Sequence, residues 1–244
     1  MTGHPASGPT RAGFAVCDVI AGSTAAFSIA SALFHRTQTG KGQLIDISML
    51  EASLAFLSSE VADLTMADVK PELLGNRAVS LAPTADLFRT GDGYILFAVT
   101  FERQIRALMK GLDRLDVLDD PRFADDVVRL QNQAALREVI ESILATRSAR
   151  EWERILNDAG APCASIWTLQ EIVDHPQIKA RQAIHNVDTP NGPARMAGLG
   201  FKLAHGGGTI DRAAPRLGEH NDEVLAAAGY AASERETLRK NNVV

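Results

Sequence analysis

The sequence has few cysteines, few aromatic residues and no block of charge of one sign. Of its 244 residues only Cys17 and Cys163 are cysteines, and their spacing is not that of a metal site. So few cysteines exclude a disulfide-rich secreted scaffold and favour a reducing compartment weakly, although a bond between these two stays open. With scattered basic residues, a net charge of −5 and a pI near 5.7, nothing predicts binding to nucleic acid or to acidic membranes.

Long apolar runs and targeting signals are also missing. No apolar run approaches the roughly 20 residues that a membrane span needs. Residues 1–13 are polar, contain glycine and proline, and lack the hydrophobic core of a signal peptide. We therefore expect a cytoplasmic protein without a membrane segment. Its 45% hydrophobic and 23% charged residues are typical of a globular chain with one large or two small domains.

Familiar phosphate and metal motifs are absent. Gly40-Lys41 resembles the end of a phosphate-binding loop, but His35 stands where that motif needs its first glycine, and Gly42 where it needs Ser or Thr. The glycines at 206–208 do not have the spacing of a dinucleotide fingerprint. The six histidines show no paired spacing on one helix face, so we expect no metal site.

The N-terminal third predicts helices around one strand. From 18 to 36 the residues are mostly small, with a few large apolar ones, which predicts a closely packed, buried helix. Ile45 and Ile47 predict a short strand over 44–48. A second apolar helix is expected over 49–66.

The rest of the chain alternates hairpins and capped helices. The turn over 90–93 predicts a β-hairpin. Ser148 with Glu151, and Thr168 with Glu171, form capping-box patterns that predict two helix starts. The other expected elements are helices over 102–112 and 130–145, a helix end at Gly160, a strand over 163–167, a turn over 190–193, a helix capped by Asn221 that ends near Gly229, and a last helix opened by Ser233 with Glu236.

Asp18 opens the first predicted helix and has two interpretations. Aspartate is a favoured N-cap, although Ala21 stands where a capping box would have Glu or Gln. The same geometry suits a nucleophile, because a helix N-terminus stabilises the carboxylate anion and an ionised carboxylate can attack an activated acyl carbon. Cys17, in the same apolar segment, is expected to be a small buried hydrophobic residue.

The order and spacing of several short segments resemble the class III CoA-transferases. This CaiB/BaiF family includes formyl-CoA transferase and carnitine CoA-transferase, and the resemblance covers nearly the whole chain. The matching segments are Asp18 to Gly22, Ala32-Leu33, His35-Arg36, Thr39 to Gln43, Ile45 to Ala52, Ala82-Pro83, Phe88 to Thr90, Asp92-Gly93, Asp120 to Phe123, Glu151-Trp152, Gly160 to Ala164 and Leu217 to His220.

The resemblance implies an α/β fold with two domains. Residues 1–70, with the nucleophile, and 181–244 would form the C-terminal part of a Rossmann-like large domain, and 71–180 a smaller α+β domain. The family's dimers are interlocked. Its members also carry a large N-terminal CoA-binding half before the aspartate, whereas here only 17 residues precede Asp18. We therefore expect either a partner chain that supplies that half, in a homo- or hetero-oligomer, or a truncated product.

The resemblance also implies a chemistry. It places the family's catalytic aspartate on Asp18, which would form an anhydride with the acyl group and then a thioester with CoA. Met49 matches a position near the coenzyme in some members. Acyl-CoA and a carboxylic acid would be the substrates, with no metal and no permanently bound cofactor. Some members carry a glycine-rich loop near 75–82, where this chain keeps only Gly75.

Three functions stay open. The first is CoA transfer. The second is epimerisation as in α-methylacyl-CoA racemase, which would use Asp18 as an acid/base; Glu102 aligns with a glutamate of the racemases, but it also reads as a solvated residue that opens a helix. The third is a non-catalytic subunit or fragment.

Overall fold

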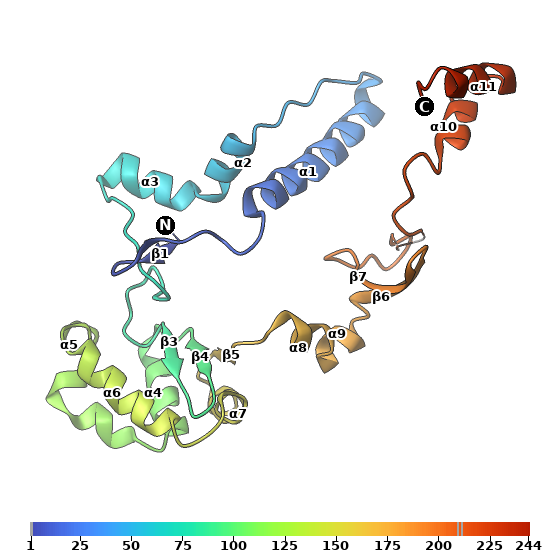
Figure 1. The fold of residues 1–244 in the computed structure, drawn as a ribbon. Helices are drawn as coiled ribbons and strands as arrows, with labels where there is room; N and C mark the ends of the chain where they lie inside the picture. Colours follow the sequence, from blue (N-terminus) through green and yellow to red (C-terminus); the bar gives the residue numbers. More distant parts are fainter. Residues whose placement is uncertain (1, 209, 211) are drawn as a thin grey trace. The chain divides into compact units, whose positions relative to one another are not determined.

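The computed structural model describes residues 2–208, 210 and 212–244 (Figure 1). The chain is an α/β protein and divides into two compact units, Met1–Ile166 and Trp167–Val244. The boundaries expected from the resemblance, 1–70, 71–180 and 181–244, stay a prediction.

The first unit starts with a small hairpin and three helices. Strand β1 (Gly3–His4) pairs antiparallel with β2 (Gly8–Pro9). Helix α1 (Val16–Thr39) follows, then α2 (Met49–Phe56), which packs against α1, and α3 (Ser58–Ala67). Helix α1 ends at Gly40, whose left-handed backbone lets its N–H donate to the Arg36 carbonyl at 2.8 Å. The predicted first helix and glycine turn are confirmed, and Gly40 is a helix cap.

Three predictions for this region are wrong. Residues 44–48 form no strand, because no other described segment pairs with their backbone. The helix expected over 49–66 is interrupted at Leu57, whose non-helical backbone separates α2 from α3. No residue of α1 is buried, since in the described chain mainly α2 covers it.

A three-stranded antiparallel sheet organises the core of the first unit. Its order is β3 (Leu87–Arg89), β4 (Tyr94–Phe97) and β5 (Cys163–Ser165). Alternation puts Phe88, Ile95 and Phe97 on the buried face, and the rings of Phe88 and Phe97 stack with their centroids 4.9 Å apart. The predicted hairpin and the strand after Pro162 are confirmed.

Helices close this core on one side of the sheet. They are α4 (Glu102–Gly111), the short helices η1 (Leu115–Asp119) and η2 (Pro121–Phe123), α5 (Asp126–Gln131), α6 (Gln133–Leu144) and α7 (Ala149–Ala159). Their buried faces include Leu108, Leu136, Ile140, Leu144 and Leu156. The helix expected over 130–145 begins at Gln133, after a break at Asn132.

Helix α7 shows how its local sequence fixes an element. Ser148 and Glu151 form the predicted capping box, and Gly160 ends the helix with a φ of 91°. The side chain of Asp92, in the hairpin turn, accepts a 2.8 Å hydrogen bond from the N–H of Ala149. The turn and the helix start are therefore tied together.

The second unit consists of short helices around a hairpin. Its elements are α8 (Leu169–Val173), α9 (Pro176–Ala180), β6 (Ile184–Thr189) paired with β7 (Gly192–Ala197), α10 (Asn221–Ala227) and α11 (Ala232–Lys240). The capping box of Thr168 and Glu171 and the turn at 190–193 are confirmed.

Two predicted caps in this unit are wrong. Asn221 lies inside α10 as its first residue, because the helix starts one position earlier than a cap at Asn221 requires. Helix α11 begins at Ala232, and the carboxylate of Glu234, rather than that of Glu236, accepts a 2.7 Å bond from the N–H of Ala231.

Helix α1 also corrects the expectation about apolar runs. Among the described residues it is long and apolar enough to cross a membrane, by length and composition alone. The valine, isoleucine, leucine and phenylalanine residues between Asp18 and Arg36, with alanines between them, make it so, although serine, threonine and glycine lie among them. Core helices of globular proteins meet the same criterion.

The core around α7 predicts a matched pair of stability effects. Leu156→Ala should lower the free energy of unfolding by about 2–5 kcal/mol, because Leu156 is fully buried among other apolar side chains. Leu169→Ala removes the same atoms from a side chain that is 78% exposed, and should change stability by less than about 0.5 kcal/mol. Urea denaturation followed by tryptophan fluorescence measures both, and equal effects would contradict this core.

Candidate active site

Asp18 lies in the first turn of α1 and is not the residue that caps it. The helix starts at Val16, with Ala15 at the N-cap and no side-chain cap bond. The N-cap interpretation of Asp18 is therefore wrong, because the chain enters the helix before Asp18 is reached. The side chain is exposed and makes no hydrogen bond or ion pair with any described residue. A carboxylate in a first helical turn is stabilised as the anion by the helix dipole.

The neighbours of Asp18 are apolar and exposed. Phe14 and Val19 are 64% and 56% exposed, and Cys17 is exposed as well. The expectation that Cys17 is buried is wrong, because no described segment packs over the start of α1. Both cysteines are free, so no disulfide joins them. Asp18 thus stands among exposed, mostly apolar side chains at the start of α1.

Met49 is the first residue of α2. Ser48 caps this helix by accepting a 3.3 Å bond from the N–H of Glu51, and the Met49 side chain is 49% exposed. Because α1 and α2 pack together, Met49 and Asp18 belong to neighbouring helices (Figure 1). The coenzyme contact of Met49 stays a prediction.

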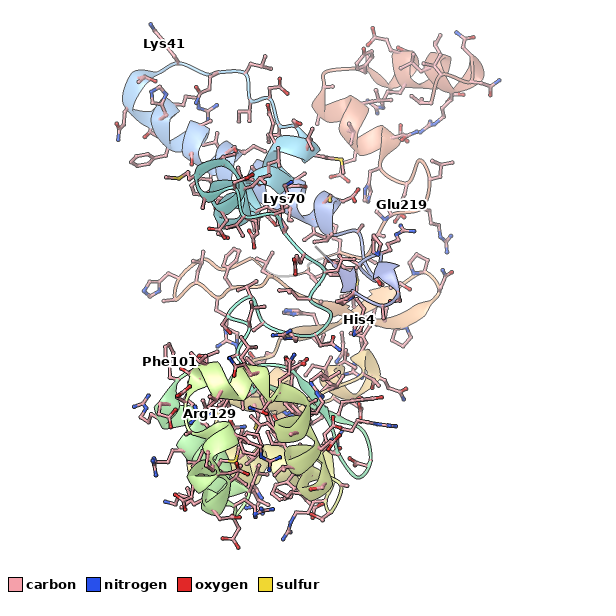
Figure 2. All side chains as sticks on the ribbon, turned by 90° about the vertical axis from the view of Figure 1, so that its left-hand side faces the viewer. His4, Lys41, Lys70, Phe101, Arg129 and Glu219 are labelled. Carbon is pink, nitrogen blue, oxygen red and sulfur yellow. The ribbon has the colours of Figure 1, made fainter. Side chains whose placement is uncertain are left out.

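Glu102 is the first residue of α4 and is held in an ion pair. Its carboxylate accepts bonds from Arg129 at 2.6 Å (Oε2 to Nη1) and 3.2 Å (Oε1 to Nη2). Arg129 is buried in the lower group of helices in Figure 2, and also donates to the carbonyl oxygen of Phe123 and to the carboxylate of Asp126. Glu102 is half-exposed yet paired, so it is not simply a solvated helix start.

Other acids in the matching segments also have structural partners. Asp120 caps η2 through the N–H of Arg122, and hydrogen bonds from the Arg122 guanidinium lower the pKa of that carboxyl. The hydroxyl of Ser148 lowers the pKa of Glu151 in the capping box. Asp92 holds the start of α7, as described above. Asp18 differs from all three, since its carboxylate stabilises nothing in the described chain.

Cys163 is not suited to nucleophilic chemistry. Burial, and then the charge of Glu153, raise the pKa of its thiol to about 12. The thiol therefore stays protonated at neutral pH, and the thiolate is the reactive form. Among residues 2–208, 210 and 212–244 no group of three His, Cys, Asp or Glu side chains is arranged to hold a metal ion.

Several arginines were not expected from the sequence. The guanidinium of Arg137 donates to Asp86 at 2.5 Å and lies over the Phe88 ring, 4.4 Å from its centroid. Arg129 is buried in its network of oxygens. The one available signal was that Arg129 and Asp126 are three residues apart, a spacing that brings two side chains to one face where the chain is helical, but no helix was predicted there.

Comparison with known proteins agrees with the resemblance. The model of CoA-transferase family III matches residues 1–221. The chain is 29% identical to succinyl-CoA–D-citramalate CoA-transferase of Chloroflexus aurantiacus, over 92% of this chain and 56% of that protein. It is 31% identical to acetyl-CoA:oxalate CoA-transferase of Acetobacter aceti, over 81% of this chain and 51% of that protein.

A solved structure gives the same picture for the fold. A CaiB/BaiF family protein from Brucella suis superposes with a TM-score of 0.80 at 27% identity, covering 93% of this chain and 59% of that one. The chain thus spans a little over half the length of the relatives that it matches.

The ion pair of Glu102 predicts a stability effect. Glu102→Gln should lower the free energy of unfolding by about 1.5–3 kcal/mol, because it removes a charged acceptor from the buried Arg129. Glu138→Gln makes the same change at an exposed position of α6 and should be neutral within about 0.5 kcal/mol. Thermal unfolding of the two variants checks this, and equal melting temperatures would rule out the stabilising role of Glu102.

Proposed function

This chain belongs to CoA-transferase family III, and we propose that it carries the nucleophile of an enzyme that moves CoA from an acyl-CoA donor to a carboxylic acid. The observation that carries the proposal is that the Asp18 carboxylate is exposed and, among the described residues, unpaired. It is an exposed carboxylate in the first turn of α1, without a partner among the described residues, in the segment that resembles the family's catalytic aspartate.

The proposed reaction needs only carbonyl exchange. A carboxylate oxygen of Asp18 attacks the thioester carbon of the donor, the C–S bond breaks, and CoA leaves as the thiolate. The thiolate then attacks the aspartyl carbonyl of this anhydride, which releases the donor carboxylate and leaves an aspartyl-CoA thioester. The acceptor carboxylate repeats the two steps in reverse order and regenerates Asp18. Each step exchanges one leaving group for one nucleophile, so the cycle is reversible.

We propose that the acceptor is a small dicarboxylic acid. The names of the two relatives above give citramalate and oxalate as acids on which those proteins act, and each of these acids has two carboxyl groups. One carboxyl would react at Asp18 while the other stays ionised. An ionised group that enters an enclosed site needs a cationic partner, because its desolvation is otherwise costly.

The racemase alternative has less support. A racemase would need the carboxylate of Glu102 free to act near the substrate. In the structure this carboxylate accepts a 2.6 Å hydrogen bond from Arg129. The third alternative, a non-catalytic subunit, would not require Asp18 to stay free of structural partners.

We further propose that another polypeptide covers α1, α2 and α3. Large apolar side chains are exposed along all three helices, among them Phe27 at 76%, Leu50 at 70% and Met66 at 86%. Single exposed apolar residues are ordinary, whereas a surface of this extent marks an interaction site. A second copy of the chain or a CoA-binding chain would bury it, and would also exclude water from Asp18. With this cover, α1 would be surrounded by protein and not by lipid, and we propose a cytoplasmic enzyme.

Asp18→Asn tests the chemistry. The amide is not a nucleophile, so in the enzyme that contains this chain the rate of CoA transfer should fall by about 1,000-fold or more with the fold intact. Hydroxylamine added during turnover should label Asp18, which mass spectrometry of the peptides would locate. Asp119→Asn makes the same change at an exposed position of η1, outside α1, α2 and α3, and should keep transfer within about twofold. Full transferase activity in the Asp18→Asn variant would show that the proposed mechanism is wrong.

Phe27→Ser tests the covered surface. If α1 is an interface, removal of this exposed ring should weaken association by about tenfold, measured as oligomer mass against concentration by light scattering. Phe101 is 71% exposed but lies outside α1, α2 and α3, so Phe101→Ser should leave association unchanged. A wild-type chain that is monomeric at every concentration would argue against a homo-oligomer. If, in addition, the chain captured no CoA-binding chain, the proposal that another polypeptide covers α1, α2 and α3 would be wrong.

A further inference from the structure

A cavity of about 320 Å³ lies within the second unit. One part of its wall is the turn that leads from α9 into β6, and the other is the segment after β7, residues 199–208 (Figure 1). Small-molecule sites have volumes of about 300–1,000 Å³, so this cavity fits a small ligand or one group of a larger ligand. Its described lining residues all belong to the second unit.

The cavity carries positive charge that no described residue balances. Arg181, His185 and Lys202 line it, and none of these side chains forms an ion pair or a hydrogen bond with a described residue. No carboxylate is among the described lining residues. Arg195 on the neighbouring strand differs, because it pairs with Asp174 at 3.1 Å. A hollow lined by charge of one sign attracts ligands of the opposite sign, and here the ligand would be an anion.

The basic groups can be reached by a ligand. Arg181 and Lys202 are exposed, and His185 is half-buried. The ring nitrogens of His185 have no partner among the described residues, yet they are not sealed from solvent. An anion in the cavity could therefore accept hydrogen bonds from all three side chains.

The hairpin fixes the position of His185 before any ligand binds. This residue pairs with Met196 across the two strands, and the N–H of Gly198 donates to the Ala183 carbonyl at 2.9 Å. A Cβ at Gly198 would lie 2.4 Å from Nε2 of His185, so only glycine leaves room for the ring there. Gln182 has a φ of 51° and turns the chain from α9 into β6.

The opposite wall of the cavity is apolar. Leu199, Phe201 and Leu203 line it, and the Phe201 side chain is 58% exposed. The segment folds back on itself, since a Cβ at Gly208 would lie 3.1 Å from Cδ1 of Leu199. Ligand sites typically combine such apolar surface with a few polar groups that fix orientation. This combination suits an anion with an apolar or aromatic body.

We propose that this cavity binds a phosphomonoester, with Arg181, His185 and Lys202 on the phosphate and Phe201 against the body of the ligand. At neutral pH a phosphomonoester carries a charge of about −1.5 to −2 and three acceptor oxygens on one atom. It therefore matches two full positive charges better than a single carboxylate does. Guanidinium can donate two parallel hydrogen bonds to phosphate, and lysine binds it as a point charge. The site does not depend on Asp18 or on the proposed function.

Binding of phenyl phosphate to the 244-residue chain tests the site. Calorimetry at constant ionic strength should show saturable binding that Arg181→Gln weakens about tenfold or more. Arg216→Gln removes the same charge at an exposed position of the second unit, away from the cavity lining, and should leave binding within about twofold. Both variants should keep the melting temperature of the wild type, because neither guanidinium has a partner among the described residues.

Two simpler probes separate the charge from the body of the ligand. Benzoate has the ring with a single charge, inorganic phosphate has the charge without a ring, and both should bind more weakly than phenyl phosphate. Phe201→Ser should weaken binding of phenyl phosphate and leave binding of inorganic phosphate within about twofold. The proposal would be overturned by absence of saturable phenyl phosphate binding, by equal binding in the Arg181→Gln variant, or by benzoate or inorganic phosphate binding as tightly as phenyl phosphate.

Discussion

The apolar side chains of α1, α2 and α3 need to be covered, and within this chain the three helices cover one another only in part. A 24-residue helix with no buried residue gains little from tertiary packing, which normally supplies most of the stability of helices in proteins. Burial of one large apolar side chain is worth about 1.5–3 kcal/mol, so Phe27, Phe34 and Leu50 together represent a large driving force for association. The solvent exposure of Asp18 therefore depends on what packs against these apolar side chains.

In contrast to these helices, the core around the three-stranded sheet is covered by other elements of the same chain. Asp92 ties the hairpin to α7, Trp152 donates its indole N–H to the Leu144 carbonyl, and Gly160 turns the chain into β5. Several of the segments that resemble the family lie here, and their residues serve caps, turns and packing. The order of these segments therefore identifies the fold. The chemistry has to be argued from residues, such as Asp18, that serve no cap, turn or packing contact in the described chain.

Local signals explain which elements the sequence predicted well. Capping boxes at Ser148 and Thr168 and the glycine end of α1 depend on contacts within a few residues, so they are visible in the sequence. The strand expected over 44–48 failed because a strand requires a partner, which local sequence does not specify. The burial of α1 failed for a related reason, since burial depends on what surrounds a helix and composition reports only that the helix is apolar.

The candidate site shows the same division. The sequence singled out Asp18 through its neighbours and through the resemblance, but it placed the residue at the cap, because the one-turn difference between a cap and a first-turn residue depends on where the backbone enters the helix. Arg129 was missed, since its partner Glu102 is distant in the sequence. Arg77 was missed as well, because its bond to the Leu81 carbonyl depends on a turn that the sequence did not predict.

The unpaired charges of Asp18 and Arg77 have different consequences for the molecule. An exposed carboxylate such as Asp18 loses nothing to desolvation, so the absence of a partner has no energetic cost and serves mainly to leave its oxygens available. The Nε of Arg77 is buried, so each hydrogen bond that it lacks lowers stability. Compared with the Nε of Arg77, the carboxylate of Asp18 is therefore both without a partner among the described residues and open to solvent.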